Sequence, residues 1–189
     1  MNPSTEDFVN KINELDHCKH IFVFPNNSNI ILASKQAQDI MSEKDIIVVE
    51  TKSIQAGLSC LMMFDHEGTV ESNTETMNEI NSNIRTASIT YAIEDTTFEN
   101  VEVKKGDYIA MANKSIVASN TDETAVILKC LDSLFEGAQD CGLLTVIAGE
   151  TSNESITAEI EKYVSENFEA EIDVIQGDQP VYDYLFGLE

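Results

Sequence analysis

Polar side chains that could hold a ligand follow two short apolar runs near the start of the chain. We call this group the crest, and its members are Asn26, Asn27, Asn29, Thr51 and Lys52. Amide and hydroxyl groups can hold a polar ligand by hydrogen bonds, and a lysine ammonium can add a positive charge for an anion. The same residue types are common in turns and at helix N-termini, where they bind only the backbone. The crest is therefore a candidate binding region, with a purely structural role as the alternative.

Other residues that could do chemistry form weaker patterns. Glu94 and Asp95 are adjacent, but neighbouring residues of a strand point to opposite faces, so we expect a solvated strand end. The stretch 17–20 contains two histidines and a cysteine, yet no second ligand pair is spaced to complete a metal site. We therefore predict no metal site.

Phosphate-binding and nucleophilic motifs are missing from the sequence. The eight glycines give neither a Gly-x-Gly-x-x-Gly nor a Gly-x-x-x-x-Gly-Lys-Ser/Thr pattern, and no Gly-x-Ser-x-Gly is present. Arg85 is the only arginine, so no guanidinium cluster can clamp a phosphate chain. We assign no catalytic residue, and we add Arg85 to the crest residues as a candidate contact for a ligand or partner.

Composition and charge limit the class of partner. The chain has 189 residues, 42% of them hydrophobic, which suits a globular protein of two lobes. Its 34 acidic and 11 basic residues give a net charge of −23, which disfavours nucleic acid and anionic membranes. This acidity serves either solubility or a partner with a basic surface. We expect no membrane insertion, no signal peptide and a cytoplasmic location, because the longest apolar run is only residues 143–148.

Hydrophobic periodicity predicts two α/β lobes that meet near residues 81–85. In lobe 1–83, the apolar runs 21–24 and 46–49 are typical of parallel strands, each followed by a polar turn able to cap the next helix. Helices are expected from Ser4 to Asp16, then over 29–41, 54–64 and 69–83. In the second and third of these helices we expect Ile40, Leu58, Leu61 and Met62 to face the core.

Lobe 84–189 begins where the period changes to two. Alternation over 87–93 predicts a half-buried strand that opens an antiparallel meander over 86–119, with turns at 104–107 and 113–114. Asn120 or Thr121 is expected to cap an apolar helix, and residues 142–188 form a βαβ unit with a final segment at 181–188. The four cysteines have no paired spacing, and we expect Cys18, Cys60, Cys130 and Cys141 to be reduced and structural.

Several stretches, in order along nearly the whole chain, resemble the C-terminal region of FakA, the kinase subunit of bacterial fatty acid kinase. These stretches are residues 1–7, 24–31, 51–57, 89–92, 105–107 and 177–184. The segments 3–5, 25–27 and 51–57 also resemble, more distantly, the crest loops of DegV-like proteins and of dihydroxyacetone-binding kinase subunits (DhaK). Glu94, the glycine-free segment 111–113 and Asp178 depart from the family pattern, and the first two departures weaken any anion-binding role for the middle strand.

The FakA resemblance implies a fold and a role. It implies a two-lobed, DegV/DhaK-like (EDD-type) α/β fold, excised from a longer protein and truncated at the N-terminal side of its first lobe. ATP and magnesium belong to the N-terminal domain of FakA, so we expect no cofactor in this chain. A separate DegV-like protein, FakB, carries the fatty acid. We therefore expect a non-catalytic domain that docks FakB; the alternatives are a domain that binds a fatty acid or polyol and a domain that dimerises the parent kinase.

Overall fold

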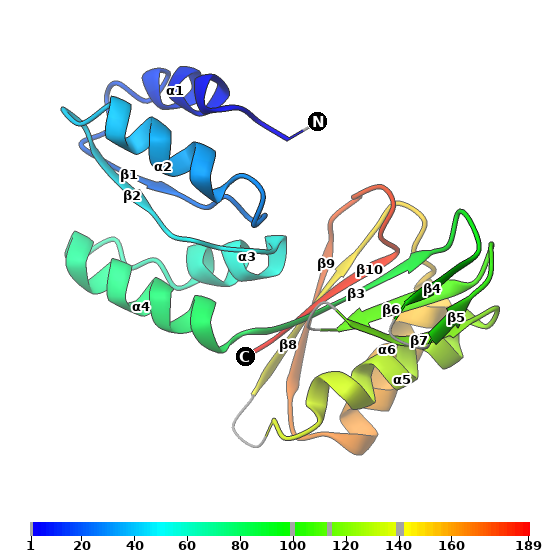
Figure 1. Cartoon of the computed structure of the whole chain (residues 1–189). Coiled ribbons are helices and arrows are strands. Elements are labelled where there is room, and N and C mark those ends of the chain that lie inside the picture. Colours follow the sequence, from blue (N-terminus) through cyan, green and yellow to red (C-terminus); the bar gives the residue numbers. More distant parts are fainter. Residues whose placement is uncertain (1, 99–100, 113–114, 139–141) are drawn as a thin grey trace. The chain divides into compact units, whose positions relative to one another are not determined.

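The chain forms two compact units, Met1–Asn83 and Ile84–Glu189 (Figure 1). The computed structural model describes residues 2–98, 101–112, 115–138 and 142–189. The division between the units falls inside the stretch 81–85, where the hydrophobic period changes. Asn113 and Lys114, where a turn was predicted, and Cys141 lie outside the described residues.

The first unit is a small parallel βα layer. In chain order it contains α1 (Thr5–Asn13), β1 (His20–Val23), α2 (Ile31–Ile40), β2 (Asp45–Val48), α3 (Ile54–Met62) and α4 (Val70–Asn83). The predicted parallel pairing is confirmed, because β1 and β2 pair in parallel with Ile21 opposite Ile46. Helices α1 and α2 pack against each other, as do α3 and α4 (Figure 1). Each helix pair shares a separate small core with the strands, which explains why the two strand sequences are apolar without alternation.

Of the helices α1, α2 and α3, the first and third begin with a side-chain cap from the polar segment before the helix, and the second does not. Ser4 caps α1 in a reciprocal capping box with Asp7, and the Ser53 hydroxyl accepts the Ala56 N–H at the start of α3. The prediction that the turn after β1 caps α2 is wrong. The N-cap of α2 is Ile30, which has no side-chain cap, because the Asn27 side chain accepts the Asn29 N–H instead.

The predicted inward face of α3 is also wrong. Leu61 is 59% exposed and Met62 is 52% exposed, whereas the residues that α3 buries are Gln55, Ala56, Gly57, Ser59 and Cys60. The inner face of α3 thus carries mostly small or polar side chains, and its large apolar side chains face outward. Ile40 at the end of α2 is likewise 64% exposed, against prediction.

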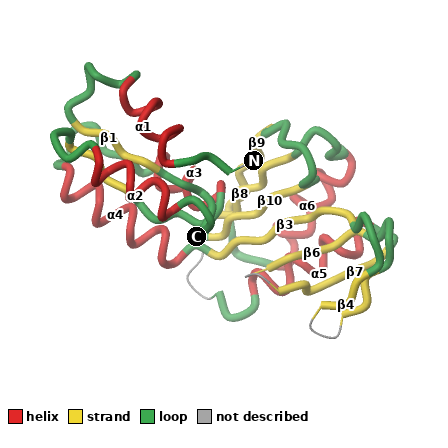
Figure 2. Tube along the Cα trace, turned by 45° about the horizontal axis from the view of Figure 1, so that its top comes forward, coloured by secondary structure: helices red, strands yellow, loops and turns green. Residues whose placement is uncertain are grey.

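The second unit is a mixed sheet with helices on one face (Figure 2). Its strands are β3 (Arg85–Tyr91), β6 (Tyr108–Ala112), β7 (Ser115–Asn120), β8 (Leu143–Ala148), β9 (Glu171–Gln176) and β10 (Tyr184–Leu188), in the order β7-β6-β3-β10-β8-β9. Strands β8 and β9 are parallel, as the predicted βαβ unit requires, and the other pairs are antiparallel. The covering helices are α5 (Glu123–Phe135) and α6 (Glu154–Asn167).

Three details of this unit differ from the sequence prediction. Strands β4 (Thr96–Phe98) and β5 (Val101–Val103) form a separate two-stranded ribbon rather than part of the main sheet. Ile93 lies beyond β3 and is 76% exposed, so the alternation does not extend to it. The cap of α5 is Asp122, whose carboxylate accepts the Ala125 N–H, because the Asn120 side chain is used one turn earlier by the Asp122 N–H.

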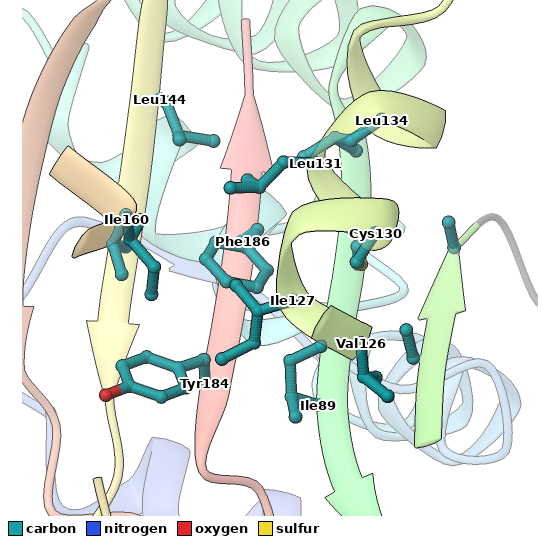
Figure 3. Close-up of a cluster of buried hydrophobic side chains, with 14 of the residues drawn as sticks. Ile89, Val126, Ile127, Cys130, Leu131, Leu134, Leu144, Ile160, Tyr184 and Phe186 are labelled. Atoms are coloured by element: carbon teal, nitrogen blue, oxygen red, sulfur yellow. The ribbon is translucent and has the colours of Figure 1, made fainter. Parts of the chain in front are cut away.

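The main core lies between the central strand β10 and helix α5 (Figure 3). Phe186 and Tyr184 of β10 are fully buried and pack against Ile127 and Leu131 of α5. Cys130 in the same core has its thiol pKa raised to about 12 by burial, which removes thiolate reactivity. Among the described cysteines, Cys18, Cys60 and Cys130 form no disulfide.

Candidate functional site

The ends of β1 and β2 bring two crest residues into direct contact. The Asn26 N–H donates to Thr51 Oγ1 at 3.0 Å, and the Thr51 hydroxyl donates to Asn26 Oδ1 at 2.8 Å. Thr51 is fully buried, and Asn26 has a φ of 59°, a left-handed conformation that asparagine tolerates better than most residues. The turns after the two parallel strands thus bring Asn26 and Thr51 together, and their side chains are joined by a hydrogen bond.

The Asn26 side chain also covers the first turn of α3. A Cβ atom built on Gly57 would lie 2.0 Å from Asn26 Oδ1 and 2.7 Å from its side-chain carbon. Only glycine therefore allows the amide to rest against this turn of the helix. The space beside Gly57, between this turn of α3 and the end of β1, is occupied by a side chain of the chain itself.

The remaining crest residues are arranged less tightly. Asn27 Oδ1 accepts the Asn29 N–H at 2.9 Å, which forms a local turn. Lys52 is exposed, and no salt bridge found among the described residues includes it. The crest therefore presents Asn27, Asn29 and Lys52 as surface groups beside the closed contact of Asn26 and Thr51.

Arg85 belongs to the second unit and binds the end of α5. Its guanidinium group donates to the carbonyl oxygens of Leu134 at 3.1 Å, Glu136 at 2.6 Å and Gly137 at 3.3 Å. These carbonyls lie at the helix C-terminus, where a cation also complements the helix dipole. The structure thus gives Arg85 a capping contact, and its predicted role toward a ligand or partner stays a prediction.

A carboxylate pair in the second unit was not predicted from the sequence. Asp183 is only 4% exposed, and its Oδ1 atom accepts a hydrogen bond from the Thr151 hydroxyl. Asp183 Oδ2 and Glu123 Oε1 are buried and accept no hydrogen bond among the described residues. The pKa of Glu123 is raised to about 7. Burial is the larger cause, and the negative charge of Asp183 is the smaller one. The pKa of Tyr108 is also raised. The largest cause is the negative charge of Glu123, followed by burial and then by the charge of Asp183, so the three groups interact.

Neither carboxylate has a sequence signal for this role. Glu123 lies in the first turn of α5, where an acidic residue is expected for the helix dipole alone. Asp183 lies between two tyrosines beside a short apolar strand, a pattern shared with many surface turns. The two residues are 60 positions apart and meet only because β10 enters the centre of the sheet.

The loop 177–183 before β10 is held in an uncommon backbone conformation. Asp178 and Val181 have φ values of 51° and 76°, and the second is costly for a β-branched residue. The Gln179 amide donates to the carbonyl oxygens of Ile147 at 3.1 Å and Tyr182 at 3.2 Å, which fixes the loop against β8. Residues 177–184 are one of the stretches that carry the family resemblance, and the contacts of Gln179 give part of this stretch a structural role in holding the loop.

An open hollow lies at the C-terminal end of α5. Its volume is about 650 Å³, and Phe135 and Phe168 stack in its wall with ring centroids 4.0 Å apart. The other lining residues are Val117, Lys129, Asp132, Ser133 and Glu136. No crest residue lines it, so the sequence-predicted site and this hollow are distinct features.

Metal and membrane features were searched over the described ranges. There, no group of three or more histidine, cysteine, aspartate or glutamate side chains is placed to hold a metal ion. His20, which raised the metal alternative, pairs with the carboxylate of Asp45 on the neighbouring strand. Within the same residues no helix has the length and apolar character needed to cross a membrane.

Sequence comparisons match the whole chain to one family. The model of the FakA-like C-terminal family, which describes the C-terminal part of fatty acid kinase proteins of the FakA type, matches residues 1–189. Uncharacterized proteins of Staphylococcus aureus strains USA300 and bovine RF122 are 36% and 37% identical to this chain over 190 residues. Each match covers 100% of this chain but only 34% of the relative, so the chain spans about a third of the length of these relatives.

Structure comparisons confirm the predicted fold. The Streptococcus pneumoniae fatty acid kinase (Fak) B3 protein loaded with linoleic acid superposes with a TM-score of 0.71 at 14% identity, covering 99% of this chain and 76% of that one. A DegV lipid-binding protein of Thermotoga maritima gives 0.68 at 16% identity, covering 100% and 76%. The dihydroxyacetone kinase of C. freundii gives 0.58 at 12% identity, covering 98% and 41%. At these identities the comparisons show a shared fold and nothing finer.

Proposed function

Since the chain belongs to the FakA-like C-terminal family of fatty acid kinase proteins, we propose that it is a non-catalytic docking domain. Its partner in this proposal is a FakB-type protein, a DegV-like carrier that presents a bound fatty acid. The phosphoryl transfer from ATP and magnesium to the fatty acid belongs, in the same proposal, to a separate N-terminal kinase domain. This chain holds the carrier in place for that reaction and needs no cofactor of its own.

The observation that carries the proposal is the closed crest. In a ligand-binding domain of this fold, we would expect the strand ends to leave room for a carboxylate or a small polyol. Here the Asn26 amide fills the space over Gly57 and binds the buried Thr51 hydroxyl. A domain that resembles a carrier but fills its own crest is better suited to binding another protein than to binding a small molecule.

The net charge of −23 supports the same proposal. An acidic surface attracts a partner with basic residues and speeds the encounter, and salt weakens this attraction. The same charge opposes close association of two identical copies, so a homodimer of this domain is less favoured than a complex with a basic partner.

The hollow at the end of α5 favours a second candidate function. Stacked Phe135 and Phe168 give it an apolar wall, which an acyl chain or another apolar group could contact. Native mass spectrometry of the protein purified from cells tests this candidate. Co-purified fatty acid would support it, whereas protein free of ligand supports docking.

Calorimetry with a FakB-type protein loaded with fatty acid tests the docking function directly. We expect binding with a dissociation constant of about 1 μM or below, weakened as the salt concentration rises. If both proteins are folded and tens of micromolar produce no detectable binding, the docking proposal fails. Consumption of ATP by this chain alone would contradict the non-catalytic part of the proposal.

A further inference from the structure

Helix α3 carries a continuous apolar stripe that faces away from its own core. The exposed fractions are 51% for Ile54, 59% for Leu61, 52% for Met62 and 56% for Met63, which follows the helix as its C-cap. Leu58 is half-buried between them. Ile54, Leu58, Leu61 and Met62 have the spacings of four, three and one residues that place side chains on one helix face. We call these four residues the α3 stripe.

The opposite face of α3 accounts for the packing of the helix. Its buried members are small or polar, namely Gln55, Ala56, Gly57, Ser59 and Cys60. The helix therefore packs on this unit mainly through these residues and not through its large apolar side chains. Single exposed apolar residues are normal on a protein surface, but a contiguous row of them marks a site of interaction.

The charges beside the stripe limit what can cover it. Residues 53–84, which contain α3 and α4, include no lysine or arginine. Their five carboxylates are Asp65, Glu67, Glu71, Glu75 and Glu79. Helix α4 packs against α3, and its exposed Glu71, Glu75 and Glu79 recur every four residues along one face. The helix that packs against α3 is thus acidic on its exposed face.

The carboxylates of the neighbouring helix disfavour two common occupants on electrostatic grounds. A second copy of the chain would present the same carboxylates and be repelled, and an anionic membrane surface would be repelled as well. A protein whose apolar contact surface is bordered by lysine or arginine residues is complementary in both apolar character and charge.

We infer that the α3 stripe and the α4 carboxylates form the surface on which the acyl-carrying partner docks, which rests on the docking function proposed above. The stripe supplies the desolvated apolar centre of the contact, and Glu71, Glu75 and Glu79 supply its acidic rim. The partner presents an apolar patch with a basic border. Lys52 of the crest precedes Ile54 by two residues, so the crest borders the N-terminal end of this surface.

Paired substitutions at matched exposed positions test the inference. The test variant carries Leu61→Gln and Met62→Gln on α3, and the control carries Leu32→Gln and Ile40→Gln on α2, which are 69% and 64% exposed. All four side chains are exposed, so both variants should keep the circular dichroism spectrum and melting temperature of the wild type. We expect the α3 variant to raise the dissociation constant for the loaded carrier at least about tenfold and the α2 control less than about twofold.

A third variant tests the rim. Glu71, Glu75 and Glu79 are changed together to glutamine, which should reduce the salt dependence of binding while leaving the stripe intact.

The possible results separate this surface from the docking function. If wild-type binding is tight and the α3 variant binds equally well, the surface is wrong and docking stands. If the wild-type chain does not bind the carrier at all, docking and this surface are both wrong. Sedimentation that shows a wild-type dimer, which the α3 variant dissociates, would also overturn the inference, because the stripe would then bind a second copy.

Discussion

Glu123 illustrates how tertiary structure overrides the local role of a residue. In the first turn of α5 the helix dipole favours its ionised form, yet burial and the neighbouring Asp183 carboxylate raise its pKa to about 7. Desolvation therefore outweighs the dipole at this position. The carboxyl group of Glu123 is therefore neutral over part of the physiological pH range.

This shift makes the stability of the second unit depend on pH. The folded pKa of Glu123 lies above the unfolded value, so its contribution is full below the unfolded pKa and is lost as pH rises toward about 7. The variant Glu123→Gln should be more stable than the wild type at about pH 8 and similar at about pH 5. Because the group is only partly buried, we expect a difference of about 1 kcal/mol by urea unfolding.

The ionisation of Tyr108 gives a second readout of the same cluster. Its pKa is raised chiefly by Glu123, so Glu123→Gln should lower the tyrosine pKa in an ultraviolet titration. Glu75→Gln on the exposed face of α4 is the matched control. Equal pH dependence of the wild type and the Glu123 variant would show that the two carboxylates do not interact as the structure indicates.

The contact of Asn26 with Gly57 predicts whether the variant Gly57→Ala is more or less stable than the wild type. Replacing a helical glycine by alanine ordinarily stabilises a protein by up to about 1 kcal/mol. At Gly57 the new Cβ would overlap Asn26 Oδ1, so we expect Gly57→Ala to destabilise by about 1–3 kcal/mol instead. In an Asn26→Gly background the alanine should cost much less, since glycine also suits the φ of 59° at that position.

Urea unfolding of the two single variants and the double variant measures this coupling. Gly142→Ala is the control, because no atom lies within 4 Å of its added Cβ. If the costs of the two single variants simply add, the Asn26 amide does not rest on α3, and the closed crest that supports the docking function is lost.

Among the elements, α5 depends on caps at both ends. Asp122 caps its N-terminus, and Arg85 of β3 reaches three carbonyl oxygens at its C-terminal end. The variant Arg85→Met keeps the side-chain length but removes every donor, and we expect a loss of about 1–2 kcal/mol in the stability of the second unit. Lys129→Met on the exposed face of α5 should cost less than about 0.5 kcal/mol. An Arg85 variant that unfolds like the wild type but docks poorly would show that the arginine serves the partner.

Local sequence patterns predicted where helices and strands lie in the chain better than they predicted which helix face is buried or which strands are neighbours. The apolar runs at β1 and β2 gave the correct parallel pairing, because strands buried on both faces need no alternation. The hydrogen bonds between Asn26 and Thr51 were not predicted, although parallel strands end at the same edge and bring the two turns together. The order of strands in a sheet depends on long-range contacts, so nothing in residues 184–188 marked β10 as a central strand.

The inverted face of α3 was missed for a related reason. A hydrophobic stripe at helical spacing usually faces the core, and Leu61 and Met62 fit that rule. The small residues Ala56, Gly57 and Cys60 form an alternative inner face that periodicity alone cannot rank. The carboxylate pair likewise joins residues from α5 and from the loop before β10, which only the folded sheet brings together.

At the scale of the whole molecule, the two units differ in how much core each possesses. The second unit has one large core between a six-stranded sheet and two helices. The first unit has only two paired strands and two small cores of a few buried residues each. Small sheets with little buried apolar area are marginal on their own. The free energy of unfolding is therefore expected to be distributed unevenly along the chain.

Hydrogen exchange measures this distribution directly. We expect amides of β3, β8 and β10 to exchange only by global unfolding, and amides of β1 and β2 to exchange at least about 10-fold faster through opening of the first unit alone. Residues 84–189 expressed without the first unit should keep the circular dichroism of a folded α/β protein, because their core contains no residue from 1–83. Equal protection of β1 and β10, with one unfolding transition for the whole chain, would mean that the small cores of the first unit gain stability from elsewhere. If the first unit is labile, its amides should become protected when the carrier binds the α3 stripe, because binding stabilises the folded state.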